Sequence, residues 1–313
     1  MIIFHLLLIA ALSLVVSRAA SYIARSVSGI ARGVSLSGFL VSFGVLGFAT
    51  SMPEISVAVF SAARGMPELS LGDLIGANIV ILSLLVGLSA VISGKVRHNS
   101  LYRNGTLVLF LLDVLLPAAV LVDGRLTRAD GMVLIAAHVG FMAHMYRVQK
   151  KDGRAFATHA NSGKSLRRNA IIGIVAMSVL LVASYFLVSS AVLVAKELGI
   201  SALIIGLMLF SVGTNVPETT FVLTESRRHN DVVLGDLFGS TLMNTPTLGL
   251  LALISPFTVP QYAAVMASCA FLTALVALFG MFMWTRRSLD RVEGWFLIAF
   301  YVAFIGYYAQ FLS

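Results

Sequence analysis

The sequence predicts an all-α polytopic membrane protein with ten transmembrane helices in two inverted five-helix repeats. The chain of 313 residues is 58% hydrophobic and only 12% charged, which is unusual for a soluble domain. Its apolar residues fall in runs long enough to cross a bilayer, which takes about 20 helical residues. A sequence pattern near residue 71 also recurs near residue 234. These three observations place most of the chain in a lipid bilayer.

Ten apolar runs can be counted along the chain. The first lacks a basic N-terminal region and is longer than the apolar part of a typical signal peptide, so it is interpreted as a retained helix. We expect residues 1–147 to form the first repeat, 148–168 a linker and 169–313 the second repeat. The predicted spans are 2–18, 34–60, 71–93, 104–122, 130–147, 169–195, 201–225, 233–255, 260–284 and 291–312.

The basic residues between these spans predict the orientation in the membrane. With the N-terminus outside, 18 of the 22 Lys and Arg residues fall on the cytoplasmic side. Arg18, Arg25 and Arg32 are among them, in an expected loop after the first span. The positive-inside rule then predicts a cell (inner) membrane protein with both termini outside and a cytoplasmic linker. The net charge of +8 is explained by these loops, so nucleic acid is not an expected partner.

The repeat supports two halves of opposite orientation. Leu71–Gly76 matches Leu234–Gly239 at an offset of 163, with five of six residues identical. Leu126–Gly131 matches Leu289–Gly294 at the same offset. Each half has five predicted helices, an odd number, so the second half enters the membrane inverted. This is an architecture of transporters, whose substrate site lies at the repeat interface.

A Thr-x-x-Pro-Glu stretch occurs in each half, at residues 50–54 and 214–218. Glu54 and Glu218 are the only charged residues in the central parts of their spans, where an ionisable group is costly and marks a functional site. The prolines free backbone carbonyls inside the expected helices. Carboxylates, hydroxyls and freed carbonyls together form an oxygen cage that suits a hard cation such as Ca²⁺ or Na⁺.

Three aspartates also lie in or near predicted spans. Asp73 and Asp236 fall near expected helix starts, where each is either a helix cap or a proton-binding or supporting residue of the site. Asp113 lies in an apolar run, and its repeat counterpart is Val276. It is a candidate proton or ion-pathway residue, or a polar contact between helices.

Other motifs favour packing over chemistry. Gly72 and Gly76, like Gly235 and Gly239, have the small-residue spacing that lets helices approach closely. His138 and His144 correspond to tyrosines in the second half, which favours polar interface or packing positions over metal ligands. Cys269 is the only cysteine, so no intrachain disulfide is expected.

The two stretches resemble the alpha-repeats of the sodium/calcium exchanger family, within the cation/calcium antiporter superfamily, and the prokaryotic type in particular. The family pattern, Gly-Thr-Ser-x-Pro-Glu followed by Gly-Asn-x-x-Gly-Ser-Asn-x-x-Asn, is similar to Ala49–Glu54 with Gly72–Ile81 and to Gly213–Glu218 with Gly235–Asn244. The resemblance covers nearly the whole chain.

The resemblance implies roles for individual residues. Glu54 and Glu218 would be the central calcium ligands, and the carbonyls of Thr50 and Thr214 would complete that site. The flanking cation sites would involve Ser51, Asn215, Ser240 and Asn244.

Departures from the family pattern bear on coupling. Ala77 and Ile81 replace a serine and an asparagine of the first repeat, and Asn215 replaces a serine of the second. Asp73 and Asp236 replace asparagines and add two potential charges. The usual multi-sodium stoichiometry is therefore in question.

We expect a secondary antiporter that exchanges Ca²⁺ against Na⁺ by alternating access. The alternatives are H⁺-coupled exchange of Ca²⁺ or another cation, and a degenerate or channel-like binding protein of the exchanger fold. An enzyme is not expected, because no nucleophile–base pair accompanies the two glutamates. No cofactor is expected. The predicted partners are inorganic cations and the lipid bilayer; a monomer is favoured and an oligomer stays open.

Overall fold

The computed structural model describes residues 2–33, 48, 51–96, 105–151, 163–227, 230–286 and 288–310. Almost all of them are helical, apart from four two-residue strands. The first half contains α1 (Ile2–Gly33), α3 (Met52–Ala63), α4 (Pro67–Ile79), the π-helical segment η2 (Val80–Leu85), α5 (Val86–Ser93), β1 (Lys95–Val96), α6 (Thr106–Val120), β2 (Arg125–Leu126) and α7 (Arg128–Lys151).

The second half repeats this arrangement with differences around its broken second span. It contains α8 (Gly163–Leu198), α9 (Ala202–Ile205), the π-helical segment η3 (Gly206–Phe210), α10 (Ser211–Thr214), α11 (Val216–Glu225), α12 (Asn230–Ile254), β3 (Phe257–Thr258), α13 (Tyr262–Arg286), β4 (Leu289–Asp290) and α14 (Arg291–Ala309).

Local sequence explains several helix ends. Pro67 opens α4 with Glu68 in the first turn, where a missing N–H costs nothing and a carboxylate favours the positive end of the helix dipole. Asp290 and Glu293 form a reciprocal capping box at the start of α14. Gly94 ends α5 with a φ of 82°, a conformation that side chains with a Cβ rarely adopt.

The predicted all-helical membrane fold is confirmed at the level of its class. Seven described helices are long and apolar enough to cross a membrane, and an eighth candidate combines α9–α10 with α11 across a bend of 42°. Two further apolar helices, α3 and α6, have 12 and 15 residues. Each of the ten predicted spans has a helix at its place in the chain. The count of ten transmembrane spans itself stays a prediction.

The predicted loop after residue 18 is wrong. α1 continues through Gly33, so Arg18 and Arg25 lie on the helix. Residues 19–28 contain no glycine or proline to end a helix, and Ala19, Ala20 and Ile23 are buried. Packing against α8 therefore extends α1 well beyond its most apolar part. The expected linker 148–168 is also shorter, because α7 reaches Lys151 and α8 begins at Gly163.

The two halves contact each other at two pairs of positions that the sequence repeat relates. Strand β1 pairs with β4, and β2 pairs with β3, both antiparallel. At the repeat offset, β1 overlaps β3 and β2 overlaps β4, so the two pairings are equivalent. Gly87 and Gly294 meet where α5 crosses α14, and Gly131 and Gly249 meet where α7 crosses α12. A Cβ on any of these four glycines would come within 3 Å of a carbonyl oxygen or side chain of the facing helix.

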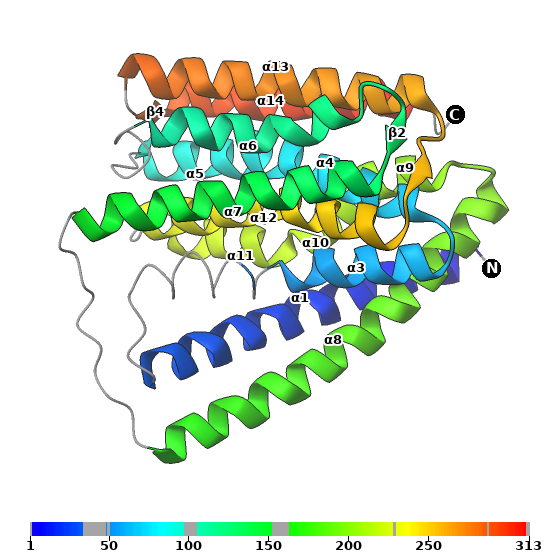
Figure 1. Cartoon of the computed structure of the whole chain (residues 1–313), viewed down its shortest axis with the longest axis horizontal. Helices are drawn as coiled ribbons and strands as arrows, with labels where there is room; N and C mark the ends of the chain where they lie inside the picture. Colours follow the sequence, from blue (N-terminus) through cyan, green and yellow to red (C-terminus); the bar gives the residue numbers. More distant parts are fainter. Residues whose placement is uncertain are drawn as a thin grey trace.

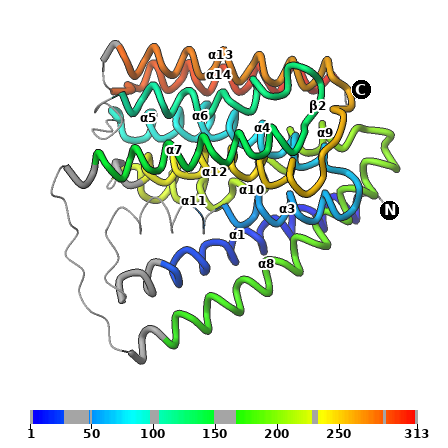
Figure 2. Tube along the Cα trace, in the orientation of Figure 1, coloured from blue at the N-terminus to red at the C-terminus, as the bar shows by residue number. Residues whose placement is uncertain are grey.

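The helices form a large packed body with a helix pair on one side. Figure 1 shows α13 and α14 at one edge, α5, α6, α7 and α12 in the middle, and α1 beside α8 at the other edge. The same arrangement can be followed along the trace in Figure 2. Buried apolar residues fall into two clusters: one within the packed body, and one that joins α1 and α8 to α3 and η3. The outer faces of α1 and α8 expose large apolar side chains, including Leu7, Leu14, Ile174 and Phe186, as expected of a lipid-facing surface.

Candidate functional site

The second Thr-x-x-Pro-Glu stretch lies where a helix is interrupted, and in the first stretch a described helix begins. In the second half α10 ends at Thr214 and α11 begins at Val216, with Pro217 in its first turn. In the first half α3 begins at Met52, with Pro53 in its first turn. The prolines therefore start new helices, where the sequence predicted kinks within continuous ones. Ala49 and Thr50, including the predicted carbonyl ligand of Thr50, lie outside the described residues. A break in a helix inside the membrane leaves backbone carbonyl groups without helical hydrogen bonds, and a bound ion can use them as ligands.

Glu54 and Glu218 are brought into one buried region. Their exposed fractions are only 3% and 2%. The charges of the two carboxylates repel each other, and Asp73 and Asp236 add to this repulsion. Each glutamate leaves its Oε2 atom without a hydrogen-bond partner among the described residues. Buried carboxylates without compensation are costly, so this arrangement requires protons or a cation.

Ser240 and Thr214 supply the hydroxyl groups next to these carboxylates. Ser240 on α12 donates to Glu218 Oε1 at 3.1 Å. Thr214 Oγ1 lies within hydrogen-bonding distance of two acceptors, Asp73 Oδ1 at 3.2 Å and the Phe210 carbonyl at 3.1 Å, and it also interacts with Glu54. The second-half stretch thus reaches directly into the first half.

Close helix packing explains how Asp73 reaches Thr214. Gly72 on α4 lies against α9 and η3, where an added Cβ would stand 2.2 Å from the Leu203 carbonyl oxygen. Gly206 on η3 lies equally close to the Leu69 carbonyl. The predicted small-residue packing is confirmed for α4, whereas Gly235 has no such neighbour among the described residues.

The helix-cap interpretation of the two aspartates is wrong. Asp73 is fully buried and lies six residues after the start of α4 at Pro67. Asp236 lies six residues after the start of α12 at Asn230 and is half-buried. Neither can bond the free N–H groups of a helix start, which belong to the first turn.

Asn215 lies between α10 and α11, and Ser51 lies directly before α3. Asn215 is buried and donates its amide to the Ser211 carbonyl at 2.7 Å, which leaves its Oδ1 atom without a partner among the described residues. Ser51 is buried directly before α3, and its side chain does not cap that helix. Each residue precedes the glutamate of its stretch by three positions, and its role in a flanking cation site stays a prediction.

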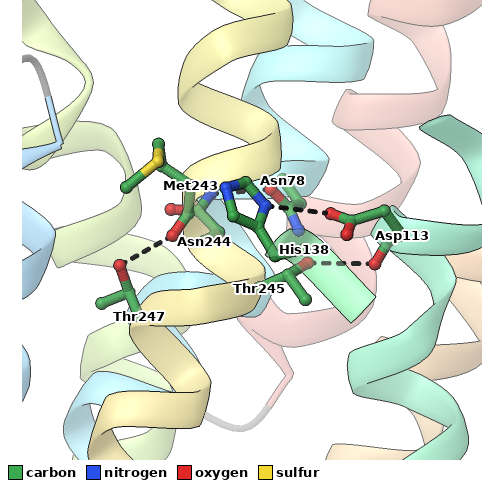
Figure 3. A network of polar contacts seen from close by, with 7 residues as sticks. All are labelled: Asn78, Asp113, His138, Met243, Asn244, Thr245 and Thr247. Atoms are coloured by element: carbon green, nitrogen blue, oxygen red, sulfur yellow. Dashed lines mark hydrogen bonds and ion pairs between the residues drawn. The ribbon is translucent and has the colours of Figure 1, made fainter. Parts of the chain in front are cut away.

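Asn244 meets Asn78 between the two halves. The Asn244 amide on α12 donates to Asn78 Oδ1 on α4 at 2.7 Å, and both side chains are buried (Figure 3). Sequence reasoning did not single out Asn78, although it lies in the first-repeat motif Gly72–Ile81. Two residues beyond Asn78 the helix continues as the π-helical segment η2, and η3 comes directly before α10. Such π-helical segments are common beside functional sites because they redirect side chains and carbonyls.

The unpaired groups of the site are all oxygens. Among the described residues, buried oxygens without a hydrogen-bond partner include Glu54 Oε2, Glu218 Oε2, Asp73 Oδ2 and Asn215 Oδ1. This donor set matches a hard cation or protons, and it lacks the nitrogen and sulfur ligands of a zinc site. In the described part of the chain no three His, Cys, Asp or Glu side chains group closely enough to hold a metal by themselves. A cation here would therefore also need hydroxyl, amide and carbonyl ligands.

Asp113 lies apart from the glutamates, on α6. It faces His138 on α7, with 3.8 Å between Asp113 Oδ2 and His138 Nδ1, and its backbone carbonyl accepts a bond from Thr245 (Figure 3). The sequence identified the aspartate and predicted a polar interface or packing position for the histidine, but it did not pair the two residues. Their meeting depends on how α6 and α7 pack, and no spacing in the sequence could show it.

An apolar helix broken between Thr214 and Val216, beside buried carboxylate, hydroxyl and amide oxygens, is the arrangement of a membrane protein of the secondary cation transporter class. The family model for the sodium/calcium exchanger protein matches residues 4–147 and 169–309. The chain belongs to this family, and the predicted family, transport and antiport assignments are confirmed. It is a transporter of cations in a family of exchangers.

Relatives and a solved structure agree with this placement. The chain is 28% identical to the putative antiporter CaxA of Alkalimonas amylolytica, covering 90% of both chains. It is 23% identical to the sodium/calcium exchanger MaX1 of Methanosarcina acetivorans, covering 92% of this chain and 93% of that protein. It superimposes on the sodium-calcium exchanger NCX_Mj, soaked with Na⁺ and Sr²⁺, with a TM-score of 0.69, 26% identity and coverage of 98% and 99%.

Proposed function

We propose that this protein is a secondary antiporter that exchanges Ca²⁺ against Na⁺ across the cell membrane. The observation that carries the proposal is the set of buried, unpaired oxygens on Glu54, Glu218, Asp73 and Asn215, contributed by both halves of the chain. Family membership and the likeness to the exchangers MaX1 and NCX_Mj support the same choice of ions. Carboxylate, amide and carbonyl oxygens are the ligands that both cations prefer.

In this proposal Glu54 and Glu218 bind Ca²⁺ at the centre, together with the carbonyls of Thr50 and Thr214. Ser51, Asn215, Ser240 and Asn244 contribute to flanking sites for the counter-ion. The mutual repulsion of the two glutamates makes the empty site unfavourable, so a divalent cation, several monovalent ones or protons must occupy it. Occupants that relieve the same repulsion compete, and this competition couples the two fluxes.

The proposed fold comprises ten spans in two inverted five-helix repeats, 1–147 and 169–313. The equivalent strand pairings β1–β4 and β2–β3 support it, as do the equivalent glycine crossings Gly87–Gly294 and Gly131–Gly249. The separate apolar cluster of α1 and α8 supports alternating access in which this pair shifts against the packed body. The distribution of basic residues supports outside termini and a cytoplasmic linker.

A proton-coupled antiporter is the second candidate, and specific residues favour it. Asp73 and Asp236 add two acids beside the glutamates, and both interact with them electrostatically. At position 77 this chain has alanine where the family pattern has serine, so a hydroxyl group is missing from the first repeat. More acids and fewer neutral ligands favour protons over Na⁺ as the occupants that alternate with Ca²⁺.

One flux experiment separates these candidates. Purified protein is reconstituted into liposomes loaded with Na⁺, with an acidic K⁺ buffer or with a neutral K⁺ buffer, and uptake of radioactive Ca²⁺ is followed. Sodium coupling predicts uptake only from Na⁺-loaded vesicles, and proton coupling predicts it only from acid-loaded ones. The experiment is repeated with Sr²⁺ and with Mn²⁺ in place of Ca²⁺. If neither the Na⁺-loaded nor the acid-loaded vesicles take up any of these cations, the proposal is refuted and a binding protein of the exchanger fold is left.

A further inference from the structure

Asp113 is a buried acid that the proposed exchange does not use. It lies in the middle of α6 with an exposed fraction of 5%, between the fully buried Phe110 and Val114. Among the described residues neither of its carboxylate oxygens has a hydrogen-bond partner. A negative charge in this position is energetically unfavourable, so the Asp113 carboxylate requires a proton or a positively charged partner.

His138 is the partner that the fold supplies. Its exposed fraction is 7%, and its Nδ1 atom lies 3.8 Å from Asp113 Oδ2 (Figure 3). This distance exceeds a hydrogen bond but leaves no room for an intervening water, so a small side-chain rotation brings the two groups into direct contact. One proton shared between carboxylate and imidazole makes the pair neutral, which is the favoured state in a low dielectric.

The helices around the pair bring no competing charge. α13 carries no charged residue between Tyr262 and Trp284, and Cys269 is the titratable group between them. α12 has no titratable group from Leu237 to Ile254. The other titratable groups on α7 lie at a distance along the helix from His138. Arg128 and Asp130 are near its start, His144 is next to Thr106, and Tyr146, Arg147, Lys150 and Lys151 are closer to its end. The proton on the pair therefore depends mainly on Asp113 and His138 themselves.

A hydrogen bond connects the pair to the cation site. Pro117 has no N–H, so it cannot bond the carbonyl four residues earlier, at Asp113. Thr245 on α12 donates to that carbonyl at 3.0 Å. The preceding residue, Asn244, belongs to the proposed flanking cation site and donates to Asn78. α6 is also held to α12 by edge-to-face packing of Phe110 on Phe238, with ring centroids 5.1 Å apart.

We propose that Asp113 and His138 form a proton-binding site that is coupled to cation binding at Asn244; the coupling rests on the proposed function. A cation that arrives beside Asn244 disfavours positive charge nearby, so the pair releases its shared proton to water. No other bond forms or breaks. When the cation leaves, the pair takes a proton back. Because linkage is reciprocal, protonation of the pair weakens cation binding by the same factor.

Two variants with a matched control test this site. Asp113→Asn keeps the shape of the side chain, and His138→Gln keeps a polar side chain without the imidazole, so each variant removes one member of the pair. His144→Gln removes a histidine of the same helix outside the pair. Calorimetric titration of the detergent-purified proteins with CaCl₂ in buffers of different ionisation enthalpy gives the protons released per Ca²⁺. Wherever the wild type releases protons on binding Ca²⁺, we expect up to about one proton fewer per Ca²⁺ in both variants. The half-saturating Ca²⁺ concentration should then change by up to about tenfold less for each pH unit.

Infrared spectroscopy tests the proton site without any Ca²⁺. Acidification of the wild type should produce a protonated-carboxyl band that is absent in Asp113→Asn, shifted in His138→Gln and unchanged in His144→Gln. If the wild type fails to bind Ca²⁺ but this band behaves as described, the proton site stands and the proposed function and the coupling fail. If both variants keep the wild-type proton release, or if the band does not depend on Asp113 and His138, the pair is a structural contact and the inference is overturned. A variant that does not purify as a folded protein is replaced by the other one.

Discussion

The two Thr-x-x-Pro-Glu stretches have nearly the same sequence but different surroundings. Glu218 accepts a hydrogen bond from Ser240 on α12. At the repeat offset of 163, the residue in place of Ser240 in the first half is Ala77, which has no donor for Glu54. The sequence repeat therefore places one glutamate in each half, while the side chains next to the two glutamates differ.

The same contrast extends to the asparagine contact. Asn244 bonds Asn78 across the halves, whereas the repeat counterparts of these residues are Ile81 and Thr241. Ile81 is apolar, and Thr241 donates to the Leu237 carbonyl of its own helix at 2.8 Å. These two polar contacts thus both involve side chains of the second-half helix α12.

Removing either glutamate charge is expected to have the largest effect and to be equally severe in both halves. Glu54→Gln and Glu218→Gln each leave the site one charge short, and breaking a buried charge interaction costs about 3–5 kcal/mol. We expect Ca²⁺ flux in proteoliposomes to fall by about 100-fold or more. Glu68→Gln, which changes an acid at the start of α4, is the matched control. Undiminished flux in either site variant would remove that glutamate from the site.

Ser240→Ala tests the bond to Glu218 whose counterpart at Ala77 is missing from the first half. The variant leaves Glu218 Oε1 without its hydroxyl donor, and hydrogen bonds to charged groups contribute about 1.5–3 kcal/mol. We expect a change of about tenfold in the half-saturating concentration of Ca²⁺ or of the counter-ion. Ser61→Ala is the control, because Ser61 is equally buried but bonds the Ala58 carbonyl of its own helix. If Ser240→Ala resembles that control, the asymmetry has no consequence for ion binding.

Gly72→Ala tests the close approach that joins the halves. The added methyl group would stand 2.2 Å from the Leu203 carbonyl oxygen, so α4 must move away from α9 and η3. Overpacking of this kind costs about 1–3 kcal/mol, and the Asp73–Thr214 bond should lengthen. We expect a lower melting temperature in detergent. Gly140→Ala, at an exposed position of α7 with no described atom within 4 Å, should melt like the wild type or slightly above it.

Ala77→Ser restores the missing hydroxyl and is expected to have the smallest effect. Ala77 is fully buried, so the added oxygen must find a partner, and Glu54 is the acceptor at the equivalent place. We expect a change of about two- to fivefold in half-saturating Na⁺ concentration, the size of one ordinary hydrogen bond of about 0.5–1 kcal/mol. A larger effect on Ca²⁺ than on Na⁺ in the same flux assay would contradict the assignment of this position to a flanking site.

The sequence alone determined the class of fold, the repeat and the two glutamates. Long apolar runs can only be helices in a membrane, because every backbone group must be bonded there. A charged residue in such a run is so costly that Glu54 and Glu218 stand out without any structure. The offset of 163 followed from residue identities, and the family resemblance implied that Ser51, Asn215, Ser240 and Asn244 contribute to flanking cation sites.

Only the tertiary structure decided where helices end and which side chains meet. α1 runs through Gly33 because packing on α8 supports residues that the hydropathy pattern assigned to a loop. Asp73 is a partner of Thr214 and not a helix cap, since α4 begins at Pro67. Asp113 meets His138 because α6 and α7 cross at that level. Sequence spacing specifies the faces of single helices, whereas contacts between helices depend on packing angles that arise from many side chains together.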